Sequence, residues 1–157
     1  MRLLAEIHQL RLAPQVATYS AAITACEIRK QPEEAIALLA EMRAHRLVPD
    51  VIAYSAAISA CGKGIQHDHA FELFQDMQHQ GLRRDAIAYS ATICACEPEC
   101  ALELFQAMLH QRLTPDVITY NAAISACGNG LQWELALGLF QEMQRTSLTP
   151  NVITHNA

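Results

Sequence analysis

Small polar side chains recur in two series along the sequence, and their hydrogen-bonding groups can serve either a ligand or the fold. The first series holds a hydroxyl or amide directly after a tyrosine, at Ser20, Ser55, Ser90 and Asn121. The second series is acidic or amide, at Asp50, Asp85, Asp116 and Asn151. An ionised aspartate only accepts hydrogen bonds, whereas a serine hydroxyl donates and accepts, so the two series together can meet a polar ligand edge. The second series also consists of good helix N-caps, and both interpretations stay open.

Other clusters of reactive side chains predict neither a metal site nor an enzyme. Cys94, Cys96 and Cys100 are spaced Cys-x-Cys-x3-Cys, which is not a standard zinc pattern. His67 and His69 lie two residues apart at a predicted helix start and therefore occupy different faces. The sequence has no deaminase signature, no phosphate-binding glycine loop and no paired carboxylates outside the repeats. We expect no metal, no cofactor and no catalytic activity.

The composition predicts one folded domain that is not a membrane protein. The chain has 157 residues, of which 52% are hydrophobic and 17% charged, so it can bury a core. No apolar run approaches the roughly 20 residues that span a bilayer. With 11 basic and 16 acidic side chains, the formal net charge is -5. This charge argues against a protein that holds nucleic acid by bulk attraction alone.

The sequence repeats itself with a period of about 35 residues. The motif Val-Ala-Thr-Tyr-Ser-Ala-Ala-Ile-Thr-Ala-Cys begins at Val16 and returns with few changes at Val51, Ala86 and Val117, at spacings of 35, 35 and 31 residues. We divide the single array, 1–157, into a half-repeat (1–15), four repeats (16–50, 51–85, 86–116 and 117–151) and a partial repeat (152–157). The cut ends suggest a piece of a longer array, and the 31-residue repeat is either a real variant or a sequence error.

Each repeat predicts a hairpin of two helices. In the second repeat, apolar residues fall at helical spacing twice, first at Tyr54, Ala57, Ile58 and Cys61 and then at Ala70, Leu73, Phe74 and Met77. Gly62 and Gly64 predict the turn between the helices, and Pro49 predicts the end of a second helix. One hairpin cannot bury its apolar stripe, so neighbouring hairpins must stack into an all-α solenoid of helix-turn-helix units with a concave face.

Cysteine occupies one place on the first stripe of every repeat, at Cys26, Cys61, Cys96 and Cys127. This recurrence predicts small buried residues that are neither metal ligands nor disulfide partners. Without a disulfide framework, a reducing compartment is favoured.

The repeats resemble those of the pentatricopeptide repeat family. The 34-residue tetratricopeptide repeat is close in length, but its Trp-Leu-Gly-Tyr spacing is absent, and the only tryptophan, Trp133, begins a second helix. Val-Ile-Thr-Tyr-Asn-Ala-Ala-Ile from Val117 and Leu-Ala-Leu-Gly-Leu-Phe-Gln-Glu-Met from Leu135 are similar to the pentatricopeptide consensus, as is Pro-Asp at Pro115. The resemblance extends over essentially the whole chain, in one register.

The resemblance implies sequence-selective binding of single-stranded RNA, with one base read by each repeat. In the family, the fifth and the last residue of a repeat read the base. The corresponding pairs here are Ser20 with Asp50, Ser55 with Asp85, Ser90 with Asp116, and Asn121 with Asn151. By the family's correspondence, Ser with Asp favours guanine and Asn with Asn favours a pyrimidine, so the implied target is 5′-GGGY-3′.

The resemblance also implies residues that sandwich each base and one that contacts phosphate. The second residue of each repeat is the apolar plate, here Ala17, Ile52, Ile87, Ile118 and Ile153. Ala17 is small, so we expect a weak grip on the first base. Of the lysines that often contact phosphate near the end of the first helix, only Lys63 is present, and Glu27 and Glu97 fall in the same region.

The family acts mostly in chloroplasts and mitochondria, which implies a role in processing, stability, editing or translation of an organellar transcript. No transit peptide is evident, because the N-terminal segment already forms a half-repeat. Two other interpretations stay open. The acidic balance favours a scaffold whose concave face binds a peptide, and the cut ends and short repeat favour an inert fragment.

Overall fold

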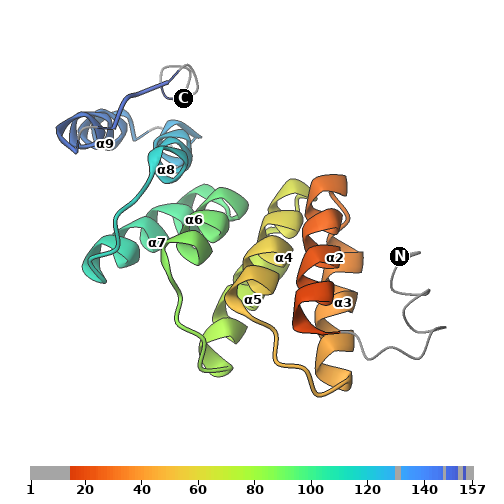
Figure 1. Ribbon diagram of the computed structural model, residues 1–157. Coiled ribbons are helices and arrows are strands. Elements are labelled where there is room, and N and C mark those ends of the chain that lie inside the picture. Colours follow the sequence, from red (N-terminus) through yellow and green to blue (C-terminus); the bar gives the residue numbers. More distant parts are fainter. Residues whose placement is uncertain (1–14, 130–131, 147, 152–153, 155–157) are drawn as a thin grey trace.

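The computed structural model describes residues 15–129, 132–146, 148–151 and 154, and these residues form helices without strands, which confirms the predicted all-α solenoid (Figure 1). The first helices are α2 (Val16–Arg29), α4 (Val51–Lys63), α6 (Ala86–Ala95) and α8 (Val117–Asn129). The second helices are α3 (Pro32–Ala44), α5 (His67–His79), α7 (Pro98–His110) and α9 (Trp133–Arg145). Each predicted repeat contains one such pair. Most of the predicted half-repeat, together with Ile153, lies outside the described residues.

The first helices form a continuous layer. α2, α4, α6 and α8 pack one against the next, and α3, α5 and α7 each contact the first helices on both sides. In Figure 1, α2 to α5 run side by side, whereas α8 and α9 are seen almost end-on, so the stack twists along its length. None of the described helices is long and apolar enough to cross a membrane.

Aromatic residues hold neighbouring repeats together. Each first helix buries one tyrosine, at Tyr19, Tyr54, Tyr89 and Tyr120. The ring of Tyr89 packs edge-on against Phe74 of the preceding repeat, with centroids 5.0 Å apart, and Tyr120 packs in the same way against Phe105 at 5.3 Å. Such pairs contribute about 0.5–1.5 kcal/mol beyond their buried area. The core of this protein is therefore largely the interface between repeats.

α3, α5 and α7 each end through a left-handed residue. α3 ends at Ala44, well before Pro49. Arg46 has a φ of 59°, and the backbone N of Leu47 donates to the carbonyl of Met42 at 2.9 Å, which satisfies a carbonyl of the last turn. Left-handed residues close α5 and α7 at Gly81 and Arg112. The prediction that Pro49 ends the second helix is wrong.

Gly62 is likewise not a turn residue, because it lies in the last turn of α4. A Cβ atom at this position would lie 2.6 Å from Cβ of Ala95 and 2.8 Å from its Cα. Gly64, by contrast, is the C-cap residue of α4. Gly62 therefore permits the close approach of α4 and the end of α6.

The short third repeat is accommodated by a shorter first helix. α6 has 10 residues, whereas α4 and α8 have 13. It ends because Cys96 adopts an extended backbone and α7 begins at Pro98. Cys26, Cys61 and Cys127 are buried as predicted, but Cys96 is only partly buried. The prediction for Cys96 is wrong because the helical turn that would bury it is missing.

Candidate nucleic-acid interface

A groove of about 680 Å³ runs over the layer of first helices, and three isoleucines line it. Ile52, Ile87 and Ile118 are the second residues of their helices and are 65%, 66% and 62% exposed. Large apolar side chains in a row on an exposed face are typical of a binding surface. The structure thus brings together three of the predicted base-sandwiching residues. Ala17 is exposed but does not line this groove.

Ser55 lines the groove, and its hydroxyl is buried without a partner among the described residues. Ser55, Ser90 and Asp116 are among the lining residues. The side chain of Ser55 is buried between the isoleucine positions, and its Oγ has no hydrogen-bond partner among the described residues. Leaving such a buried polar atom unpaired costs about 1–3 kcal/mol. A ligand group that pairs with Oγ would remove this cost.

Two of the predicted reading pairs are joined directly. Ser20 Oγ donates to Asp50 Oδ1 at 3.2 Å. Asn121 Nδ2 donates to Asn151 Oδ1 at the same distance of 3.2 Å. In the second and third repeats, no hydrogen bond joins the serine to its aspartate within the described part of the chain. The four pairs are therefore not equivalent in the free protein.

The aspartates cap the helices, as their residue types predict. Oδ1 of Asp50 accepts from the backbone N of Ala53 at 2.8 Å, and Asp85 caps α6 in the same way. Asp116 Oδ1 accepts from both the backbone N and Oγ1 of Thr119, at 2.8 and 2.6 Å. All these bonds use Oδ1. Because Oδ2 accepts no hydrogen bond from the described residues, capping leaves one oxygen of each carboxylate for a ligand.

The serine and asparagine residues that follow the core tyrosines are more buried than expected. A residue one position after a core residue is turned roughly 100° away from the core. Ser20 and Asn121 are each only 6% exposed, and Ser90 is partly buried. The reason is that the first helices pack side by side, so this flank of one helix is covered by the start of the next. Of this series, Ser55 and Ser90 line the groove, together with the exposed isoleucines.

Lys63, the predicted phosphate contact, forms an ion pair across two repeats. Its Nζ lies 2.8 Å from Oε1 of Glu27, which belongs to the preceding repeat. Ser59 Oγ donates to the same oxygen at 2.8 Å. All three residues line the groove. The repeat register predicts Lys63 near the end of a first helix, where it lines the groove, but the sequence analysis does not predict its pairing with Glu27.

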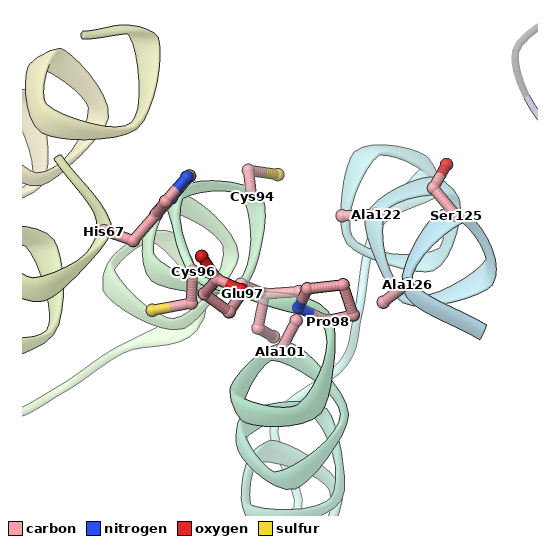
Figure 2. Close-up of a pocket in the computed structure, with 10 residues that line it drawn as sticks. His67, Cys94, Cys96, Glu97, Pro98, Ala101, Ala122, Ser125 and Ala126 are labelled. Carbon is pink, nitrogen blue, oxygen red and sulfur yellow. The ribbon is translucent and has the colours of Figure 1, made fainter. Parts of the chain in front are cut away.

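A second pocket, of about 320 Å³, lies where the short α6 ends (Figure 2). His67 of α5 lies on one side and Ser125 of α8 on the other, and Cys94 lines both this pocket and the groove. Burial and the neighbouring Cys100 raise the pKa of Cys96 to about 12, so its thiol stays protonated at neutral pH. Among the described residues, no group of three or more His, Cys, Asp or Glu side chains could hold a metal ion.

The fold defines an all-α helical-repeat protein with a groove along its first helices. Sequence comparison gives the family. A model of the PPR repeat family matches residues 14–63 and 115–157, a pentatricopeptide repeat domain model matches 72–130, and a PPR repeat model matches 52–82. The chain belongs to the pentatricopeptide repeat family.

Solved structures of this family have the same fold. The maize pentatricopeptide repeat protein PPR10 is 30% identical with a TM-score of 0.70, over 99% of this chain and 23% of PPR10. PPR10 in complex with an 18-nt psaJ RNA element is 27% identical with a TM-score of 0.69, and the match covers 99% of this chain and 27% of that one. The PPR domain of Arabidopsis thaliana protein-only RNase P 1, in complex with tRNA, has a TM-score of 0.81 at 13% identity, over 99% and 84% of the two chains. No curated protein sequence matches the chain.

Proposed function

We propose that the groove binds single-stranded RNA, with one base read by each repeat. The observation that carries the proposal is the buried, unpartnered Oγ of Ser55 in a groove lined by the exposed Ile52 and Ile87. The similar PPR10 was crystallised with an RNA element, which supports the same class of ligand here. The chain spans 27% of PPR10 in that complex, so the full activity of such a protein belongs to the proposal as well.

The arrangement suits a base inserted edge-first between apolar plates. Ile52 and Ile87 would contact the two faces of the base, while Ser55 Oγ and Asp85 Oδ2 would meet its polar edge. By the family's correspondence the Ser and Asp pairs favour guanine, whose pairing edge has N–H donors that a carboxylate can accept. With the Asn pair of the fourth repeat favouring a pyrimidine, the target is 5′-GGGY-3′. We expect a loose first base, since Ala17 offers no comparable plate.

Fluorescence anisotropy with a labelled RNA that contains GGGC tests the proposal. The comparison ligands are a scrambled RNA and the matching DNA, each at low and at physiological salt. Selective binding of the GGGC RNA is the expected result. No RNA binding at low salt, with circular dichroism showing intact helices, would overturn the proposal. Binding of a peptide partner in its place would favour the scaffold function, which the net charge of -5 supports.

A single substitution tests base reading at one position. By the family's correspondence, Ser55→Asn with Asp85 unchanged moves the preference at the second base from guanine toward uracil. The preferences at the other three bases are the internal control. Ser125→Asn is the matched control for the chemical change, because Ser125 lines the second pocket and not the groove. An unchanged preference in Ser55→Asn would contradict one-base-per-repeat reading.

The proposal includes a place of action. We infer a role in processing, stability, editing or translation of a chloroplast or mitochondrial transcript, from the usual setting of pentatricopeptide repeat proteins. Cell fractionation of the full-length protein checks this part, and recovery from the cytosol alone would contradict it.

A further inference from the structure

Glu27 and Lys63, which both line the groove, form an ion pair that neutralises the charge of the lysine. Glu27 comes from the end of α2, and Ser59 and Lys63 come from the end of α4. Oε1 of Glu27 accepts from Lys63 Nζ and from Ser59 Oγ, both at 2.8 Å. The side chains of Glu27 and Lys63 are 23% and 44% exposed, so the carboxylate is partly withdrawn from water. Two donors on one partly buried oxygen hold Lys63 in a fixed position.

The charge of the groove makes this pair important. Lys63 is the one cationic side chain among the described residues that line the groove, and Glu27 and Asp116 are its two carboxylates. Arg29 and Lys30 are exposed close to Glu27 in sequence, but neither lines the groove. With Lys63 neutralised by Glu27, the lining carries no uncompensated positive charge. Phosphate groups carry much of the affinity of nucleic-acid binding, so this lining is a poor one for them.

We propose that Glu27 sets the affinity and the salt dependence of RNA binding by occupying Lys63. This inference rests on the proposed RNA-binding function. A phosphate that is to contact Lys63 must first displace the Glu27 carboxylate, and the freed carboxylate then lies beside the phosphate and repels it. The intact protein therefore gains little from Lys63, and its binding depends mostly on contacts with the bases.

The size of the effect follows from counterion release. Each phosphate neutralised on a single strand makes the slope of log K against log salt more negative by about 0.7. We take the contact to contribute nothing at 1 M salt. One regained contact then tightens binding about 8-fold at 50 mM salt and about 3-fold at 200 mM salt. Glu27→Gln removes the competing charge, and its amide oxygen can still accept from Ser59.

The experiment measures RNA affinity at these two salt concentrations for the wild type and for Glu27→Gln. Glu33→Gln is the matched control, since it makes the same change in net charge at an exposed residue that pairs with Gln66 outside the groove. We expect about 8-fold and about 3-fold tighter binding for Glu27→Gln. Less than about a 2-fold change is expected for Glu33→Gln, because exposed charges outside the site are screened.

Lys63→Gln provides the second test. In the wild-type background it leaves the Glu27 carboxylate unpaired in the groove and should weaken binding, whereas in the Glu27→Gln background it should abolish the gain. Wild-type binding that Glu27→Gln leaves unchanged, or a gain that survives Lys63→Gln, would overturn the inference alone. RNA binding by none of the folded variants at 50 mM salt would overturn the inference together with the proposed function.

Discussion

The close approach of α4 and α6 at Gly62 makes a quantitative prediction about stability. A Cβ at this position would lie 2.6 and 2.8 Å from the Cβ and Cα of Ala95, and the Cα cannot rotate away. Gly138, within α9, has nothing within 4 Å of the same atom. Replacing glycine by alanine inside a helix stabilises it by about 0.5–1 kcal/mol. At Gly62 this gain is opposed by overpacking, which costs about 1–3 kcal/mol.

The comparison between Gly62→Ala and Gly138→Ala isolates the cost of overpacking. Because the helix-propensity gain is common to both variants, their free energies of unfolding should differ by about 1–3 kcal/mol, with Gly138→Ala above the wild type. Urea denaturation followed by circular dichroism measures this difference. For a domain of this size, each kcal/mol also shifts the melting temperature by about 2–4 °C. Equal stabilisation by both substitutions would refute the argument that α4 and α6 are in contact at Gly62.

Three further predictions concern stability. Ile65 is 77% exposed with a φ of 60°, and a left-handed β-branched residue costs about 1–2 kcal/mol, so Ile65→Gly should raise the urea midpoint; a lower midpoint would contradict this. Asp85→Ala removes the cap of α6 and should cost about 1 kcal/mol, whereas Asp85→Asn, which can still cap, should cost little; equal losses would exclude the cap as the cause. Burial and the hydrogen bond to Asp76 raise the pKa of Tyr54 to about 12. Since an unfolded tyrosine titrates near about pH 10, this stabilisation is complete below pH 10 and is lost as the pH rises toward 12; urea titrations at several alkaline pH values should show the decline, and Tyr54→Phe should make it shallower.

The sequence predicts the helices and their caps because these depend on local spacing. The period, the tyrosine stripe and the aspartates that cap α4, α6 and α8 follow from the pattern of single repeats, and the structure has all of them. Pro49 and Gly62 are misassigned because their types allow more than one role. Pro49 comes after the left-handed residue Arg46 that ends the helix. Gly62 is required because Ala95 of the next repeat packs against it. A contact between repeats leaves no local pattern around Gly62 itself.

For the candidate site too, the sequence predicts what lies within one repeat and misses contacts between repeats. The register of the repeat places Ile52, Ser55 and Lys63 at the groove, where the structure has them. It does not show that Ser55 is buried, which results from the packing of neighbouring first helices. Nor does it show the pairing of Glu27 with Lys63, since these residues lie 36 positions apart in different repeats. An acidic residue near the end of one first helix and a lysine at the end of the next is the signal that could have indicated this pair.

The shortened α6 also determines how the array comes apart. A solenoid is stabilised by nearest-neighbour interfaces, so its cooperativity is limited by the weakest one. α6 shares less contact with α8 than it shares with α4, and a pocket of about 320 Å³ lies between the end of α6 and α8. Pulling on the two ends of the chain should therefore separate the fourth repeat from the first three at this joint.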